Sequence, residues 1–326
     1  LAHDLDIEPL TDMWMKEADM LNLLAPEAKA RRWSKWYFWP LLQPLLSWLG
    51  REALPPGEAN QEMRQRLSVF LRSRWFKPPL DGPKLSTLLL DGFAAMGTPA
   101  DTVQSLMPSG TRLDLIVTVT NFHGSERSIF IHDPPLLRER EHRHLLRFCC
   151  THHKSGALDS DFGRENIATL AFAGRASASY PGAFPPAQVA EIDRLLAARR
   201  ESWPGRAAFL RDSLPTGATA DELVLLDGSI LDNKPVMATV ETIRTHSAFR
   251  EVDRRLVFID PHPGKSGLGD ITATSAAVPG FFTTLRGALS DLPRQEPMYD
   301  ELAEVSRYNK QVRCLKAAIL AARPQV

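Results

Sequence analysis

An acidic residue stands at the end of an apolar run in the second half of the chain. Leu223 to Leu226 are expected to form a buried strand, and Asp227, Gly228 and Ser229 follow directly. A helix is expected to begin at Pro235. A carboxylate held at such a strand end can accept and return a proton. The alternative is an ordinary bend, because Asp-Gly is a common turn signal.

A loop rich in small residues precedes this motif. In residues 170–189, LAFAGRASASYPGAFPPAQV, a helical pattern ends near Gly174 and Arg175. Ser177 and its small neighbours allow close approach of another backbone, and prolines beginning at Pro181 stiffen the loop. Ligands of open α/β sheets bind at the carboxyl ends of strands, so this loop and Asp227 are candidates for one site.

Histidines and cysteines gather in residues 141–153, EHRHLLRFCCTHH. These side chains are of the types that bind zinc. Neighbours on a strand point to opposite faces, however, and neither recognised spacing for a structural zinc site is present. We therefore predict no metal site and no cofactor.

Tryptophans and basic residues are concentrated in residues 29–50, where Trp33, Trp36 and Trp39 lie among lysines and arginines. This combination favours the headgroup region of a bilayer, so one hypothesis is a membrane surface contact. The other is a hydrophobic cap packed over the sheet, with basic side chains extending to water. The sequence leaves both open.

The composition narrows the class of protein. The 326 residues contain 39 basic and 39 acidic residues, so net charge gives no sign of a nucleic-acid partner. Three cysteines do not form a disulfide framework, which favours a reducing compartment, and we expect a cytoplasmic protein. No apolar run reaches the roughly 20 residues of a membrane-spanning helix.

The elements that must position Asp227 follow from hydrophobic periodicity. Helices are expected around Leu10 to Leu21 and from Leu85, where Gly97 should end the helix. Strands are expected at 112–121, 128–132 and 144–152, and within a strand-to-helix unit at 254–264. Helices are expected around 166–174, 189–196 and from 297 onward. Alternating strands and helices predict an α/β sandwich with a mostly parallel sheet covered on both faces.

Four segments together resemble the patatin-like phospholipase family, specifically bacterial patatin-related proteins. They are LDLIVTVTNFHG (113–124), RASASYPGAFPP (175–186), LLDGSILDNKPV (225–236) and IDPHPG (259–264). The resemblance implies a three-layer α/β/α acyl hydrolase domain over residues 1–295 and the start of a helical C-terminal region over 296–326.

The resemblance also implies a function and a site. Patatin-like enzymes hydrolyse lipid acyl esters with a serine-aspartate dyad, in which Asp227 would be the base. Gly228 and Ser229 would form its supporting turn, with a positive φ at Gly228. Arg175, Ser177 and Pro181 would form a wall near the acyl substrate. No nucleic-acid partner is implied.

The nucleophile of that dyad is absent from the sequence. No G-x-S-x-G elbow occurs, and the chain starts at Leu1 within an expected helix. We therefore expect a fragment that lacks the N-terminal nucleophile region and is inactive alone. Two alternatives remain: a Ser-His-Asp hydrolase that uses His262, and a non-catalytic lipid-contacting or scaffold module of the same fold.

Overall fold

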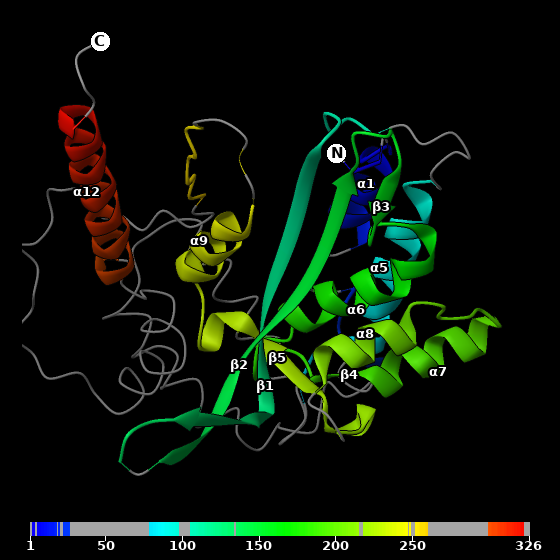
Figure 1. Ribbon diagram of the computed structural model, residues 1–326. Helices are drawn as coiled ribbons and strands as arrows, with labels where there is room; N and C mark the ends of the chain where they lie inside the picture. Colours follow the sequence, from blue (N-terminus) through cyan, green and yellow to red (C-terminus); the bar gives the residue numbers. More distant parts are fainter. Residues whose placement is uncertain are drawn as a thin grey trace, which may run out of the picture. The chain divides into compact units, whose positions relative to one another are not determined.

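The computed structural model describes part of the chain, and that part forms two compact units, residues 1–231 and 232–326. The described residues are 2–3, 5–17, 19, 22–26, 78–97, 105–133, 135–214, 218–246, 248, 252–259 and 299–322. The first unit contains the sheet and the predicted site (Figure 1).

The sheet of the first unit has five strands in the order β3-β2-β1-β5-β4. Their bounds are β1 (Thr111–Phe130), β2 (Leu136–His152), β3 (Leu158–Ser160), β4 (Ala187–Gln188) and β5 (Val224–Asp227). Every neighbouring pair among these strands is antiparallel. The predicted three-layer sandwich with a mostly parallel sheet is therefore wrong for the part of the chain that the structure describes.

The error arises from how the strands are connected. β1 and β2 follow each other with only residues 131–135 between them, and so short a connection joins antiparallel neighbours. A parallel pair would need a crossover of a dozen or more residues. The predicted strands 112–121 and 128–132 lie largely within the one long strand β1, which has an irregularity between Thr120 and Ser125.

One face of the sheet contributes to the core. Val119, Leu146, Phe148 and Leu225 are buried on it, whereas Arg147 on the other face of β2 is exposed. Helix α6 (Ile167–Ser177) packs against β1 and β5 on the buried face, and α5 (Gly82–Ala95) packs on α6. The other helices described in this unit are α1 (Glu8–Glu17), α7 (Val189–Arg199) and α8 (Arg206–Ser213).

Helix α5 confirms the helix predicted from Leu85 and its predicted end before Gly97, and it begins earlier, at Gly82. The Asp81 carboxylate accepts a hydrogen bond from the Lys84 N–H at 3.1 Å, and Pro83 occupies the first turn. Gly97 follows the helix with a φ of 102°, a conformation that favours glycine.

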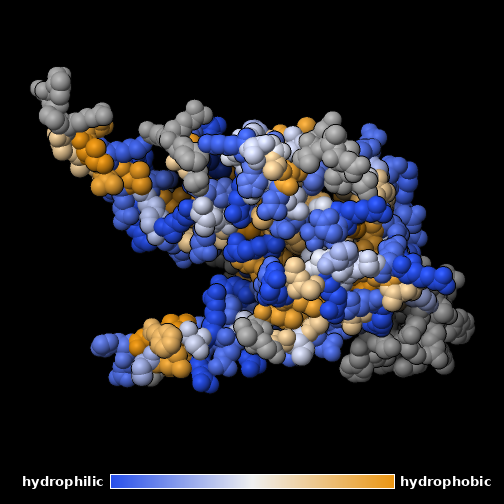
Figure 2. Space-filling model, turned by 45° about the vertical axis from the view of Figure 1, so that its right-hand side comes forward, coloured by the Kyte–Doolittle hydropathy of each residue, from blue (hydrophilic) through white to orange (hydrophobic). Residues whose placement is uncertain are grey.

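The outer end of the β1–β2 hairpin forms a projecting arm with apolar side chains (Figure 2). Phe130 is 86% exposed at its tip, and Leu136 and Leu137 are also exposed. The charged residues behind the tip pair within the arm, as in the contact of Arg138 with Glu126 at 3.4 Å.

The second unit contains α9 (Val236–Thr245) and α12 (Tyr299–Ala322), which contact each other. Helix α12 confirms the helix predicted from residue 297 onward over the residues that are described. The strand predicted within the unit at 254–264 is wrong over the described part of that unit, since residues 252–259 form no strand and are exposed. Arg254 instead donates to the carbonyls of Ile243 and His246 at the end of α9, both at 2.5 Å. The predicted domain boundary at 295/296 lies outside the described residues.

Candidate functional site

Hydrogen bonds fix the backbone of Asp227 at the end of β5. Its N–H donates to the Ser179 carbonyl at 3.1 Å, and its carbonyl accepts from the Thr120 hydroxyl at 3.0 Å. Directly opposite residues of a sheet share a face, so Asp227 lies on the buried face with Val119, its partner in register. The apolar run before Asp227 is interior, since Leu223 and Leu225 are both 0% exposed.

The half-buried carboxylate of Asp227 caps the turn that follows it. Its Oδ1 accepts a hydrogen bond from the Ser229 N–H at 2.8 Å, at the start of the 3₁₀ turn η4 (Gly228–Ile230). This is the geometry of a capping aspartate, which satisfies a backbone donor that would otherwise lack a partner. The same carboxylate can serve as a base only if a hydroxyl approaches its remaining lone pairs.

Gly228 is required for a reason other than the predicted one. It is not among the described glycines with positive φ, so the expectation of a positive φ is wrong. A Cβ at this position would instead collide with the carbonyl and the side chain of Thr118 on β1. The absence of a side chain therefore allows η4 to lie directly against the backbone of β1.

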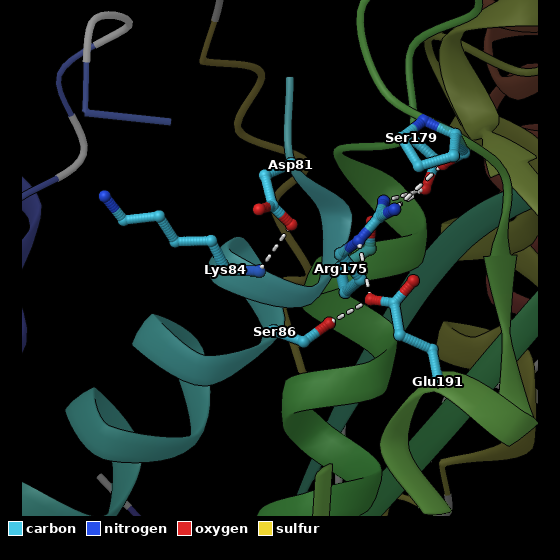
Figure 3. Close-up of polar contacts among 7 residues, drawn as sticks. Asp81, Lys84, Ser86, Arg175, Ser179 and Glu191 are labelled. Atoms are coloured by element: carbon cyan, nitrogen blue, oxygen red, sulfur yellow. Dashed lines mark hydrogen bonds and ion pairs between the residues drawn. The ribbon is translucent and has the colours of Figure 1, made fainter. Parts of the chain in front are cut away.

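Arg175 lies inside a polar network (Figure 3). The side chain is 0% exposed and its Nε donates to Glu191 Oε1 at 3.2 Å. Nη1 donates to the Ser179 hydroxyl at 2.5 Å, and Nη2 donates to the Pro185 carbonyl at 2.8 Å. Burial lowers the pKa of the Arg175 guanidinium, and the neighbouring Glu191 opposes that shift.

This network reaches the backbone of Asp227 but not the surface. Ser86 on α5 donates to Glu191 Oε1 at 2.5 Å, so α5, α6 and α7 meet at one carboxylate. Ser179, which Arg175 holds, also accepts the Asp227 N–H. Of the other two predicted wall residues, Ser177 is half-buried at the end of α6 and Pro181 is exposed.

A cavity of about 590 Å³ lies beside α6 on the buried face of the sheet. Its walls are mainly apolar, with Leu113, Leu115 and Val117 from β1 and Leu170 and Ala173 from α6. Ligand sites typically occupy roughly 300–1,000 Å³ and are mostly apolar with few polar groups. The cavity therefore has the size and chemistry of a site for an apolar small molecule.

The cavity and Asp227 are neighbours that do not coincide. The cavity reaches Val117 on β1 and Gly174 on α6. Asp227 stands opposite Val119, the next residue of β1 on the same face, and hydrogen-bonds beyond the end of α6. The sequence did not reveal the cavity, because the apolar residues of 112–121 and 166–174 predict a fully packed face equally well.

The polar side chains of the cavity wall are His3 and Arg164. His3 Nε2 lies 3.0 Å from the Ser160 hydroxyl, and burial is the main cause that lowers the pKa of His3. Arg164 begins the 3₁₀ turn η2 (Arg164–Asn166) before α6 and is exposed.

The histidine and cysteine cluster is spread over both faces of β2. Cys150 is 0% exposed, whereas Cys149 on the opposite face is half-buried. Burial is the main cause that raises the pKa of Cys149 to about 11, which disfavours the thiolate form that binds metals. Within the described ranges, no three histidine, cysteine or acidic residues come together as a metal site.

Several predicted features lie outside the described residues, namely Trp33, Trp36, Trp39 and His262. Of the helices that are described, none combines the length and the apolar character needed to cross a membrane. The chain matches no family model, no curated protein and no solved structure.

Proposed function

We propose that this chain binds a lipid acyl chain in the cavity beside α6, as part of a lipid acyl hydrolase in which Asp227 is the general base. The apolar cavity is the observation that carries the proposal. A long alkyl chain gains free energy when it leaves water for such walls, about 0.8 kcal/mol per buried CH₂.

The placement of Asp227 supports the catalytic part of the proposal. Its carboxylate shares a sheet face with Val117 and Leu115 and lies just beyond the part of the cavity at Val117 and Gly174, which we call its inner end. An ester bound with its acyl chain in the cavity and its carbonyl at that end would be near Asp227. In the proposed dyad, Asp227 takes the proton of a serine hydroxyl and returns it to the leaving alcohol.

Acyl-chain binding is tested by filling the cavity. Leu115 is 41% exposed on the cavity wall, so Leu115→Trp can narrow the cavity without disturbing a sealed core. Ile116→Trp places the same ring on the opposite face of the same strand and is the matched control. We expect Leu115→Trp to weaken displacement of a neutral fluorescent dye by 1-dodecanol at least about tenfold, or 1.4 kcal/mol. Equal binding by both variants would refute the cavity as the site.

The catalytic role is tested by separating it from capping. Asparagine keeps an oxygen for the Ser229 N–H, so Asp227→Asn should preserve stability, whereas Asp227→Ala should lose about 1 kcal/mol. Hydrolysis of p-nitrophenyl dodecanoate is measured in the longest natural polypeptide that contains this sequence. We expect Asp227→Asn to lower its rate by about 10²-fold or more.

A second candidate function is a non-catalytic lipid-contacting module. The hydrogen bond from the Ser229 N–H to Asp227 favours it, because capping alone accounts for the carboxylate. This alternative predicts that Asp227→Asn retains full ligand binding and that no ester hydrolysis occurs.

Under either candidate we propose a cytoplasmic protein that binds membrane surfaces peripherally through Trp33, Trp36 and Trp39. Replacing these tryptophans with serine should then reduce co-sedimentation with phosphatidylcholine vesicles.

A further inference from the structure

The mouth of the cavity beside α6 differs from its inner end. The exposed residues of the cavity wall, which we take as its mouth, include Ile7, which is 64% exposed, together with Arg164 and Gly97. The inner end contains Ala173, which is 2% exposed, and Gly174. A molecule with an apolar tail and a polar head therefore fits the cavity when its head lies at the mouth.

Arg164 is the charged side chain at that mouth. Its guanidinium makes no hydrogen bond or ion pair with any residue in the described part of the chain. By contrast, Arg199 on α7 donates to both carboxylate oxygens of Asp91, at 2.6 and 3.1 Å. Every N–H donor of the Arg164 guanidinium is thus available to a ligand. A guanidinium binds carboxylates and phosphates with two parallel hydrogen bonds, in a bidentate geometry.

We propose that the cavity selects anionic single-chain amphiphiles, with long-chain fatty acids as the ligand class and Arg164 as the group that binds the carboxylate. The inference rests on the proposed binding of an acyl chain in this cavity, and it adds the identity and position of the head group. The alkyl chain lies between β1 and α6, and the carboxylate stays at the mouth.

Two other titratable groups lie near Arg164: Glu165, which follows it in the chain, and His3 of the cavity wall. The Glu165 carboxylate lies over Gly163, where a Cβ would collide with it, and it acts electrostatically on His3. Its negative charge opposes an anionic ligand and therefore limits the affinity that Arg164 provides. His3 favours its neutral form because burial lowers its pKa, so it contributes a polar contact rather than a charge.

The position of Arg164 also fixes the direction of the bound chain. Arg164 precedes α6, whereas the Asp227 N–H binds Ser179 just beyond the other end of that helix. The 11 residues of α6 span about 16 Å. A fatty acid held by Arg164 therefore directs its methyl end toward Asp227, and it would compete with an ester bound in the productive direction.

The test compares three ligands with the same 12-carbon tail and different head groups. Dodecanoate is anionic, 1-dodecanol is neutral and dodecyltrimethylammonium is cationic at pH 8. Each displaces a neutral fluorescent dye from the full chain below its critical micelle concentration. We expect dodecanoate to bind about two- to fivefold more tightly than dodecanol, the range expected for one accessible ion pair. The cation should bind more weakly than dodecanol.

Single substitutions test which residues cause the preference for the anionic ligand. Arg164→Gln should abolish the preference for dodecanoate and leave dodecanol binding unchanged. Glu165→Gln should increase the preference, because it removes the opposing charge. Arg194→Gln changes an exposed arginine on α7 and is the matched control. Circular dichroism checks that each variant is folded.

The outcomes separate the two proposals. If dodecanol binds and Leu115→Trp blocks it, but dodecanoate shows no preference that depends on Arg164, this inference fails and acyl-chain binding stands. If none of the three ligands displaces the dye, acyl-chain binding fails as well. A preference that Arg194→Gln removes as strongly as Arg164→Gln would also overturn the inference, because it would reflect net charge alone.

Discussion

At the scale of single residues, His144 has an unsatisfied polar atom. Its Nε2 is buried and has no hydrogen-bond partner in the described structure. His144 stands opposite Val119, which stands opposite Asp227 in turn, so the three occupy one row across the sheet. Burial lowers the pKa of His144 from its ordinary value of 6.5, so the folded protein favours the neutral ring.

Replacing His144 with leucine should therefore stabilise the protein. Removing a buried donor or acceptor that lacks a partner is worth about 1 kcal/mol in the free energy of unfolding.

Below pH 6.5 the unfolded chain takes up a proton at His144 more readily than the folded protein does. Stability should thus fall as the pH is lowered from 7 to 5, and less so in His144→Leu. Urea unfolding at both pH values measures this, with His153→Leu at an exposed site as the control. A destabilised variant with an unchanged pH dependence would contradict the prediction.

Residue types alone could not reveal these environments. Arg175 follows a glycine before a run of small residues, which predicts a loop, yet its guanidinium is fully buried. Its burial depends on Glu191, which is 16 positions away on α7. Asp227 was found at a strand end as predicted, because that prediction required only the local apolar run and the turn signal.

At the scale of elements, the sequence predicted which segments are helices better than how the strands pair. Capping and glycine signals act locally, which is why α5 ends before Gly97 as expected. Strand direction depends on partners elsewhere in the chain. The continuous apolar character of residues 112–121 suits a covered parallel strand, but β1 pairs antiparallel with both β2 and β5.

The junction between β5 and η4 provides a prediction at this scale. Gly228→Ala would place a methyl group against the Thr118 carbonyl, which belongs to the backbone of β1 and cannot move alone. We expect a loss of about 1–3 kcal/mol in the free energy of unfolding, as in overpacked cores. Ser229→Ala is the matched control, because the capping bond uses the backbone N–H of Ser229. Chemical denaturation measures both variants, and native stability in Gly228→Ala would show that η4 can move away from β1.

At the scale of the molecule, Arg175 and Glu191 connect the helices of the first unit to the strand that carries Asp227. The ion pair joins α6 to α7, Ser86 adds α5, and Ser179 connects the pair to the Asp227 N–H. A Cβ at Gly82 would collide with the guanidinium, so the start of α5 also packs on this pair. The position of the candidate site thus depends on contacts between segments that are distant in the sequence.

Breaking this buried pair should destabilise the first unit as a whole. Arg175→Met leaves the Glu191 carboxylate buried without its cation, which typically costs about 3–5 kcal/mol. The double variant Arg175→Met/Glu191→Leu should recover part of that loss, because it removes both charges from the interior.

The pair of Arg206 and Asp193 is the control, since its side chains are 38% and 37% exposed. Arg206→Met should cost less than about 1 kcal/mol. Urea unfolding of the four proteins measures the difference, and equal losses in Arg175→Met and Arg206→Met would show that burial does not set the strength of the pair.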